Sequence, residues 1–464
     1  MSVDINTIKT VEIKTIVFGA GKKYENISIE FNRKFDVVAL VDNNPTKWGQ
    51  SIDEKIIYPP DKLLSLTYDI IYIMCSCVYE IREQLSEMGI DMLKVYDCDI
   101  NPSLMNCIDP VLNYRVINEN DLSTDIIMIS NDLTSTGSNI VLYRTAQILK
   151  NEKYNIVLIS RRDGELRQKY LMANINVMII NDLLYYNDVW KNLLSNGRLM
   201  IVNTFLLYFL LQEMDDIYKK KTIWMIHETF PFSIVNKPQF LNCVKGLRKV
   251  VVVSPLVKRM IKEKYGFQDS EIIPPGIPER RSSLKFKKNE KVIFSVLGGI
   301  NNVKGTDLVF KAIERLNEED RKLAEFWIAG IGRFSKEQER MVSEFECIRY
   351  LGEIKQDNIP NIYFHTDAMI CASRSESLSI SVIEGFMNEK TVIVSDAAGI
   401  VDYMVPNEDG LIFHSGDYKE LSNHIHWVIY NQEEAKNIGM TSRRVYDRYF
   451  TMQIYENNIK QVLE

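Results

Sequence analysis

The stretch DAMICASRSESLSISVIEGFMNEKTVIVS, residues 367–395, decides the fold. An apolar run typical of a buried strand ends at Ser373, a short polar loop follows, and a helix is predicted from Ser379 to Asn388 before a second apolar run begins. Two such strands separated by a helix are typical of a parallel sheet covered by helices. The loop lies at a carboxyl end of a strand, where ligands bind in such sheets.

The same alternation runs through almost the whole chain. Strand-length apolar runs recur at 15–19, 36–41, 69–74, 125–130, 155–160, 199–202, 222–227, 250–254, 291–298 and 326–330. Segments rich in Asp, Asn and Pro at 98–122, and in Pro and basic residues at 273–291, interrupt the pattern and indicate linkers. We therefore predict an α/β protein with a Rossmann-like domain at 1–110, two lobes at 120–280 and 288–447, and a C-terminal helix at 448–464.

Composition excludes several classes of protein. The 62 acidic and 56 basic residues give a net charge of −6, without the basic excess of a nucleic-acid-binding domain. No apolar run reaches the roughly 20 residues that span a bilayer, and we expect the run at 205–211 to be a buried helix. The N-terminal residues lack the apolar core of a secretory signal, so we expect a cytoplasmic protein.

The seven cysteines show neither disulfide-like nor CxxC spacing. We favour reduced, packed thiols. A metal site at Cys75 and Cys77 is the less favoured alternative, because no histidine is near.

Two segments are candidates for binding an anion. In VLGGINNVKGTDLVFKAI, residues 296–313, Gly298 and Gly299 let the backbone approach a ligand and Lys304 supplies a positive charge. Taken alone, this segment favours the alternative that Lys304 is a surface lysine after a turn. The free N–H groups of residues 377–379, which begin the predicted helix, favour an anion through the helix dipole.

Together these segments resemble glycosyltransferase family 4, which has the two-lobed GT-B fold. The acidic pair Glu376 and Glu384 matches its EX7E motif, and Lys304 with the following glycine matches its Lys-Gly pair. Residues 329–332 match its Gly-x-Gly turn, and 351–354 match the segment whose backbone meets the nucleobase. The donor site that the resemblance implies consists of Gly298, Gly299, Lys304, Ile354, Glu376, Ser377, Leu378, Ser379 and Glu384.

The lobe at 120–280 resembles the acceptor lobe of the same family, to which the C-terminal helix would return. Residues 130–149 resemble its first strand, glycine loop and helix, so Gly137 and Ser138 would face the cleft; a capping turn is the simpler interpretation, and both can hold. Asn203 and His227 end two strands and resemble a subset of members in which such residues face the transferred sugar. Glu228 would orient His227 or bind the acceptor. The implied catalytic residues are Glu376, Lys304, His227 and Asn203.

The chain departs from the family pattern at three positions. Members often carry an arginine where this chain has Gly299, and glycines where it has Ser377 and Ser379. Arg374 and Arg333 are candidates to replace the missing charge. An inactive GT-B partner or glycan-binding subunit therefore stays open as an alternative, as does a sugar-nucleotide epimerase.

The first domain carries part of a dinucleotide fingerprint. Gly19, Gly21 and Asp42 match it, but Tyr24 occupies the position of the third glycine. The domain resembles Rossmann-like domains fused to sugar-modifying enzymes. We favour a structural role or homo-oligomerisation over nucleotide binding.

The resemblance implies transfer of a sugar from a UDP-, GDP- or dTDP-sugar to a hydroxyl of a glycan, lipid-linked or protein acceptor, with retention, in surface polysaccharide, glycolipid or glycoprotein synthesis. We expect no metal and no other cofactor, because a lysine and a helix dipole would neutralise the leaving diphosphate. No nucleic acid is expected as a partner. Peripheral association with the inner face of the membrane is left open.

Overall fold

A computed structural model describes residues 14–25, 28, 31–32, 35–75, 78–90, 95–97, 124–179, 194–195, 197–229, 235–280 and 290–463. The linker predicted at 98–122 and Cys77 lie outside these ranges. The chain divides into two compact units. The first unit comprises residues 1–116, 161–163 and 178–190, and the second comprises the rest.

The first unit contains a six-stranded sheet in the order β3-β4-β2-β1-β5-β6. Its strands are β1 (Lys14–Phe18), β2 (Asp36–Val41), β3 (Ser51–Ile52), β4 (Lys55–Tyr58), β5 (Ile70–Ile73) and β6 (Val95–Asp97), and its α-helices include α1 (Lys22–Glu25) and α3 (Val78–Glu87). All pairs are parallel except β3 with β4. Alternate residues of β1 belong to separate apolar clusters, Val17 to one and Ile16 to the other. Both faces of the sheet are therefore covered, as parallel sheets require.

The second unit begins with a lobe built on a seven-stranded sheet in the order β13-β12-β11-β10-β7-β8-β9. The strands are β7 (Ile126–Ser130), β8 (Ile156–Ser160), β9 (Asn176–Ile179), β10 (Leu199–Asn203), β11 (Thr222–Ile226), β12 (Lys249–Val252) and β13 (Ser270–Ile272). The helices include α4 (Gly137–Asn151), α5 (Leu166–Met172), α7 (Tyr208–Glu213), α8 (Asp216–Lys219), α9 (Lys237–Val244) and α10 (Pro255–Tyr265). The buried helix predicted at 205–211 is confirmed as a 3-10 turn that leads into α7.

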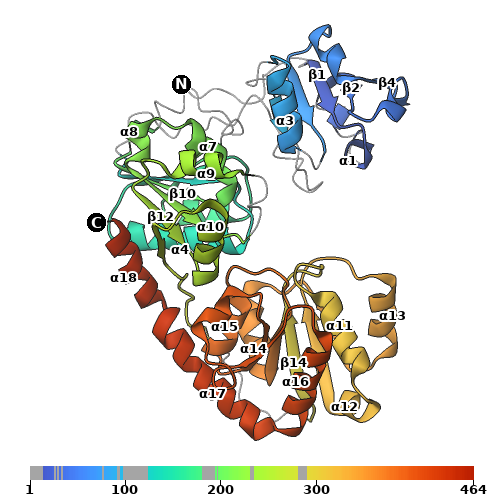
Figure 1. Cartoon of the computed structure of the whole chain (residues 1–464), viewed down its shortest axis with the longest axis vertical. Helices are drawn as coiled ribbons and strands as arrows, with labels where there is room; N and C mark the ends of the chain where they lie inside the picture. Colours follow the sequence, from blue (N-terminus) through green and yellow to red (C-terminus); the bar gives the residue numbers. More distant parts are fainter. Residues whose placement is uncertain are drawn as a thin grey trace. The chain divides into compact units, whose positions relative to one another are not determined.

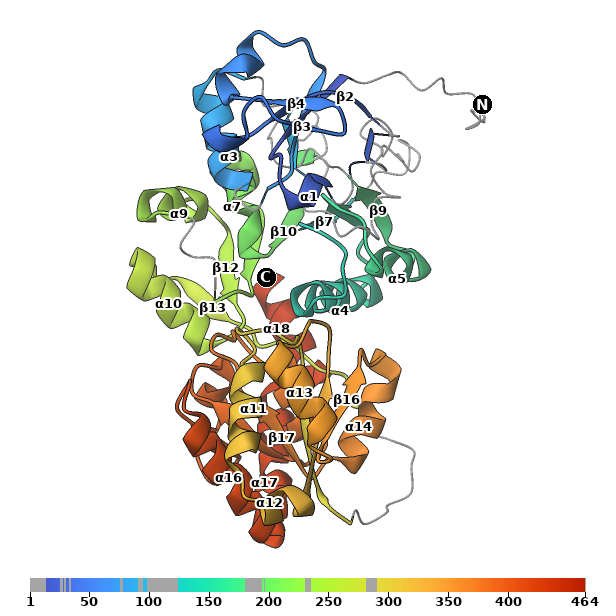
Figure 2. The same ribbon diagram turned by 90° about the vertical axis from the view of Figure 1, so that its right-hand side faces the viewer.

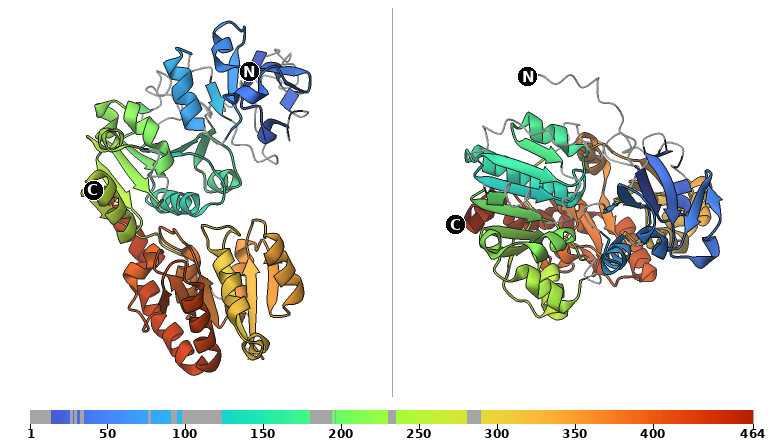
Figure 3. Two further views of the ribbon diagram at one scale, coloured as in Figure 1. Left: turned by 45° about the vertical axis from the view of Figure 1, so that its right-hand side comes forward. Right: turned by 90° about the horizontal axis from the view of Figure 1, so that it is seen from above.

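The other lobe of this unit contains a six-stranded sheet in the order β16-β15-β14-β17-β18-β19. The strands are β14 (Val292–Leu297), β15 (Ala324–Ala329), β16 (Ile348–Gly352), β17 (Ala368–Cys371), β18 (Thr391–Ser395) and β19 (Leu411–Phe413). The helices include α11 (Thr306–Arg315), α12 (Glu318–Leu323), α13 (Lys336–Glu344), α14 (Ile359–His365), α15 (Ile380–Met387), α16 (Tyr418–Tyr430) and α17 (Gln432–Tyr449). Figures 1 and 3 show helices on both sides of these strands.

The chain passes between the two lobes of the second unit more than once. After α17 it returns to the seven-stranded lobe as α18 (Met452–Leu463), where the hydroxyl of Tyr455 lies 2.6 Å from that of Thr145 on α4. Figures 1 and 2 show α17 and α18 in succession. At the crossing the N–H of Ile277 donates to the carbonyl of Phe450 at 2.8 Å. The two passages therefore lie side by side.

Candidate active site

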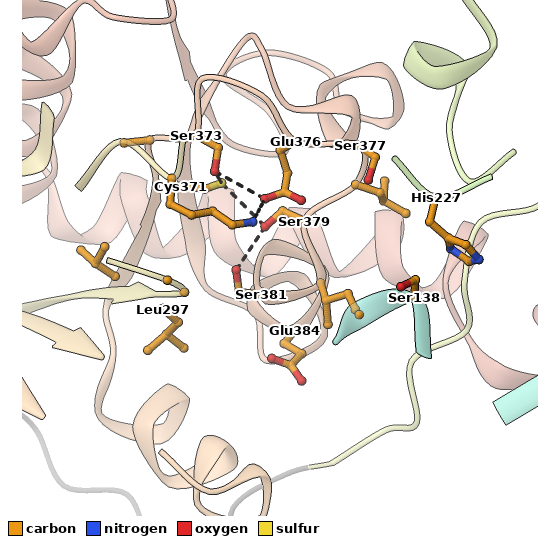
Figure 4. Close-up of a pocket in the computed structure, with 18 of the residues that line it drawn as sticks. Ser138, His227, Leu297, Cys371, Ser373, Glu376, Ser377, Ser379, Ser381 and Glu384 are labelled. Carbon is orange, nitrogen blue, oxygen red and sulfur yellow. Dashed lines mark hydrogen bonds and ion pairs between the residues drawn. The ribbon is translucent and has the colours of Figure 1, made fainter. Parts of the chain in front are cut away.

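A cavity of about 570 Å³ lies where strand ends of both lobes of the second unit meet. Its wall includes twelve of the residues predicted from the sequence, which are Gly137, Ser138, His227, Glu228, Gly298, Gly299, Lys304, Glu376, Ser377, Leu378, Ser379 and Glu384. Most of them follow β7, β11, β14 and β17 in the chain. Figure 4 shows residues from both lobes around this cavity. The fold thus brings together segments that are more than a hundred residues apart.

An ion pair joins two loops of the cavity wall. The Lys304 ammonium donates to Oε2 of Glu376, which also accepts a hydrogen bond from the Ser373 hydroxyl at 3.4 Å. Burial opposes the charge on Lys304, but the charge and the hydrogen bond of Glu376 outweigh it and raise the lysine pKa above its ordinary value. Lys304 is therefore a permanent cation in the cavity. Figure 4 shows the bond between Ser373 and Glu376.

Glycines let the lysine-bearing turn approach its neighbours. Gly305 has a φ of +67°, and a Cβ at this position would lie 1.8 Å from the carbonyl oxygen of Ala372. A Cβ at Gly330 would lie 1.6 Å from the carbonyl oxygen of Gly298. A side chain at either position would push the turn away from β17 or β15. These glycines therefore set the position of Lys304.

Two helices begin at the cavity without a side-chain cap. Ser379 is the N-cap of α15 and Thr136 is the N-cap of α4, and neither side chain caps its helix. The two helix starts are close neighbours, because a Cβ on Gly137 would lie 3.2 Å from Cδ1 of Ile380. Free N–H groups and the positive end of the helix dipole favour an anion at both places.

Glu384 forms part of the cavity wall one turn into α15. Burial raises its pKa to about 7, although the charges of Arg144 and Arg280 and a hydrogen bond from Tyr363 act in the opposite direction. The Tyr363 hydroxyl also donates to the carbonyl of Ser381 at 2.7 Å. A carboxyl in this setting can accept or donate a hydrogen bond near neutral pH.

His227 and Glu228 form the wall on the side of the seven-stranded lobe. Burial lowers the pKa of His227 to about 4, so its imidazole is neutral, and its Nε2 atom is buried without a hydrogen-bond partner. Burial raises the pKa of Glu228 to about 7. Its Oε2 accepts from the backbone N–H groups of Phe205 and His227, each at 3.0 Å. Glu228 thus holds the main chain that carries the histidine.

Asn203 is not part of the cavity wall, in contrast to the sugar-facing position that we expected. It is fully buried at the end of β10, and its amide lies 3.5 Å from Oδ1 of Asn139. Asn139 in turn donates to Oδ1 of Asp132 at 2.8 Å and to the carbonyl of Thr134 at 3.0 Å. Asn203 therefore lies behind the loop that leads into α4. We did not single out Asp132 and Asn139, although the polar run SNDLTSTGSN contains both.

Ile354 and the two candidate arginines also lie outside the cavity wall. Ile354 is half-buried, Arg333 is exposed, and Arg374 is bound to Asp307 through two hydrogen bonds of 2.7 Å. Among the described residues of the wall, Lys304 is the single lysine or arginine. The charge that is missing at Gly299 is therefore not replaced by either arginine in this arrangement.

Cys371, which the sequence did not mark as functional, also contributes to the wall. Its Sγ lies 3.7 Å and 3.6 Å from the hydroxyls of Ser373 and Ser379, and burial raises its pKa. It is a packed thiol. Within the described ranges, no cluster of three or more His, Cys, Asp or Glu residues could hold a metal ion, and no helix is long and apolar enough to cross a bilayer.

In the first unit, the acidic residue of the partial dinucleotide fingerprint binds other groups of the protein. Oδ2 of Asp42 accepts the N–H of Ala20 at 3.0 Å and pairs with Lys47 at 2.8 Å. The same ammonium donates to the carbonyl of Ala20 at 2.9 Å. Tyr24 is fully buried in the core. Asp42, the residue that would bind a ribose, is thus part of the turn's own hydrogen-bond network.

Comparison with known proteins defines the class to which this fold belongs. Residues 277–445 match the family described as glycosyl transferases group 1, and residues 11–96 match the family described as C2185-like, N-terminal. The chain has the GT-B fold of glycosyltransferases, preceded by a further α/β domain, which confirms the predicted fold class.

Individual relatives are distant in sequence. HepE of Anabaena, solved with UDP, superposes with a TM-score of 0.63 at 13% identity over 73% of this chain and 99% of its own. Sucrose-phosphate synthase of Thermosynechococcus elongatus gives a TM-score of 0.58 at 14% identity over 73% and 98%. The sulfoquinovosyl transferase SQD2 of Arabidopsis thaliana is 23% identical over 186 residues, which are 39% of this chain and about a third (35%) of that protein.

Proposed function

We propose that this protein transfers a sugar from a nucleoside-diphosphate-sugar donor to a hydroxyl of an acceptor, with retention of anomeric configuration. The observation that carries the proposal is the position of Lys304 and the uncapped start of α15 in the wall of one cavity. Both lie within the segment that matches glycosyl transferases group 1. HepE, which shares the fold, was solved with UDP and with UDP-glucose.

The charges of the site suit a departing diphosphate. When the bond between the anomeric carbon and the phosphate oxygen breaks, negative charge develops on the diphosphate. The Lys304 ammonium and the N–H groups at the start of α15 stabilise that charge without a metal ion. Because the fold holds these hydrogen-bonding groups in place, they reorganise little during the reaction.

The acceptor hydroxyl attacks from the face that the diphosphate leaves. Its oxygen bonds to the anomeric carbon, and its proton passes to the departing phosphate oxygen. His227, whose neutral Nε2 is buried without a partner, would bind a sugar hydroxyl, and Glu384 would bind a ribose hydroxyl. Closure of the lobes would exclude water and suppress hydrolysis of the donor.

The proposed acceptor is a class of molecules rather than one compound. We propose a glycan, a lipid-linked glycan or a protein as acceptor, in the synthesis of a surface polysaccharide, glycolipid or glycoprotein. The activity requires no cofactor beyond the donor.

The test is thermal stabilisation of the purified chain by UDP, GDP and dTDP. A ligand that binds only the folded state at 100 times its dissociation constant adds about 2.7 kcal/mol to the free energy of unfolding. We expect one of the three to raise the melting temperature, and Lys304→Ala to reduce this shift. No shift with any of them would contradict the proposal.

Turnover assays then separate the proposed transferase from the epimerase and the inactive subunit. The transferase consumes the donor in proportion to the acceptor supplied. An epimerase converts the donor without an acceptor, and binding without turnover indicates the subunit.

A further inference from the structure

We infer that Arg374 is a positioning residue that holds Lys304 in the cavity wall through the turn 298–305. The inference rests on the proposed function and assigns to Arg374 a role other than binding the diphosphate. Arg374 lies in the loop between β17 and α15, two residues before Glu376.

The contacts of Arg374 join this loop to the chain on both sides of Lys304. Its guanidinium donates to the carbonyl of Asn302 at 2.6 Å and to the two carboxylate oxygens of Asp307 at 2.7 Å each. Its own N–H donates to the carbonyl of Val303 at 2.8 Å. Four hydrogen bonds thus hold the chain just before and just after Lys304.

Two neighbouring contacts complete the attachment. The backbone of Gly305 packs against the carbonyl of Ala372, and Lys304 itself pairs with Glu376. The turn is therefore attached at residues 372, 374 and 376. Of these three attachments, the one at 374 involves no atom of the cavity wall. Its three side-chain hydrogen bonds can be removed by substitution, which leaves the backbone bond to Val303 and every group that would touch the donor in place.

The chemistry of the pair suits a permanent brace. A planar guanidinium matches a carboxylate in a two-point geometry that lysine cannot reproduce. The hydrogen bond from Arg374 also lowers the pKa of Asp307, so the pair stays ionised through the neutral range. Both side chains are partly exposed, at 36% and 26%. Loss of such a pair has little effect on overall stability, whereas a displacement of about 1 Å at a reactive group is costly.

The experiment measures the dissociation constant of the nucleoside diphosphate that stabilises the wild-type chain. We expect Arg374→Ala to weaken binding about tenfold, with a melting-temperature loss of only about 2–4 °C. Arg374→Lys should be intermediate, since it keeps the charge but not the fork. In a Lys304→Ala background, Arg374→Ala should weaken binding less than about twofold, because its effect passes through the lysine.

The control is Arg349→Ala. Arg349 is another exposed arginine of the same lobe, and it forms an ion pair with Glu325 at 2.9 Å. We expect this variant to bind the nucleotide like the wild type. Equal losses in the presence and absence of Lys304 would overturn the inference, as would an unchanged affinity of Arg374→Ala.

A second measurement does not depend on nucleotide binding. Amide hydrogen exchange of residues 299–306 should be faster in Arg374→Ala and unchanged in Arg349→Ala. Unchanged exchange in Arg374→Ala would overturn the inference. A wild-type chain that binds no nucleotide would count against the proposed function, and exchange would still decide the role of Arg374.

Discussion

Lys304 donates a hydrogen bond to Glu376, 72 positions further along the chain, and the two residues come from the turns that follow neighbouring strands, β14 and β17. The carboxylate occupies one side of the ammonium and keeps it charged in the absence of a ligand. The remaining N–H groups of the ammonium are available to an incoming anion. The pair thus fixes the charge in place before a ligand arrives.

The first prediction concerns this pair. Lys304→Ala should lower the transferase kcat/KM by about 100- to 1000-fold, the range for loss of one donor to a developing charge. Steady-state kinetics with the stabilising nucleotide sugar measures this. Lys311→Ala, an exposed lysine on α11 outside the cavity wall, is the matched control and should retain activity. Comparable activity of both variants would contradict the role of Lys304.

The second prediction concerns the missing arginine. Gly299 lies in the cavity wall, its φ is not left-handed, and the nearest atom to a built Cβ is Nδ2 of Asn301 at 3.0 Å, the end of a side chain that can move. Gly299→Arg should therefore bind the nucleoside diphosphate about tenfold more tightly, through one added charge-assisted hydrogen bond. Gly299→Glu should bind it more weakly. Calorimetric titration measures the dissociation constants of both variants. A change in the same direction for both would refute an electrostatic cause.

The third prediction concerns Glu228 and pH. Burial raises the pKa of Glu228 from 4.5 to about 7. Between these values the folded chain holds a proton that the unfolded chain releases, so the stability that this group contributes is fully present below about 4.5 and is lost as the pH rises through 7. Glu228→Gln keeps an oxygen for the two backbone N–H groups and removes this loss.

The difference in unfolding free energy between Glu228→Gln and the wild type should therefore grow from pH 4.5 to pH 7 in favour of the variant, by about 3 kcal/mol. Denaturant titrations of both proteins at pH 5 and pH 8 measure it. A pH-independent difference would show that the carboxyl titrates at its ordinary value.

The fourth prediction compares two glycines with nearly the same backbone conformation. Gly305 and Gly352 have φ values of +67° and +69°, but only Gly305 would place a Cβ against a neighbour, whereas Gly352 faces open space. Gly352→Ala should cost about 1 kcal/mol, the strain of the left-handed conformation alone. Gly305→Ala should cost at least about 3 kcal/mol, because the turn must also move. Melting curves measure both costs, and equal losses would show that the contact with Ala372 is unimportant.

Much of the fold could be predicted because both sheets of the second unit are parallel and buried. Buried parallel strands form continuous apolar runs, and runs such as 125–130, 222–227 and 391–395 all correspond to strands. In this unit strands β9, β13, β16 and β19 were missed, since they are only three to five residues long and each lies at a sheet edge.

The lining of the cavity was predictable where glycines and charges mark a strand end, as at Gly298, Lys304 and Glu376. It was less predictable where position depends on packing. Asn203 and His227 lie at the ends of neighbouring strands. The segment that leads into α4 covers the asparagine, whereas the histidine is part of the cavity wall. Nor could the sequence show that Arg374 is bound to Asp307, because their pairing depends on the tertiary fold.

The bond between Ile277 and Phe450 constrains how the lobes of the second unit move. A movement that separated the two passages would break this bond. Relative motion of the lobes therefore keeps the passages adjacent and pivots beside them.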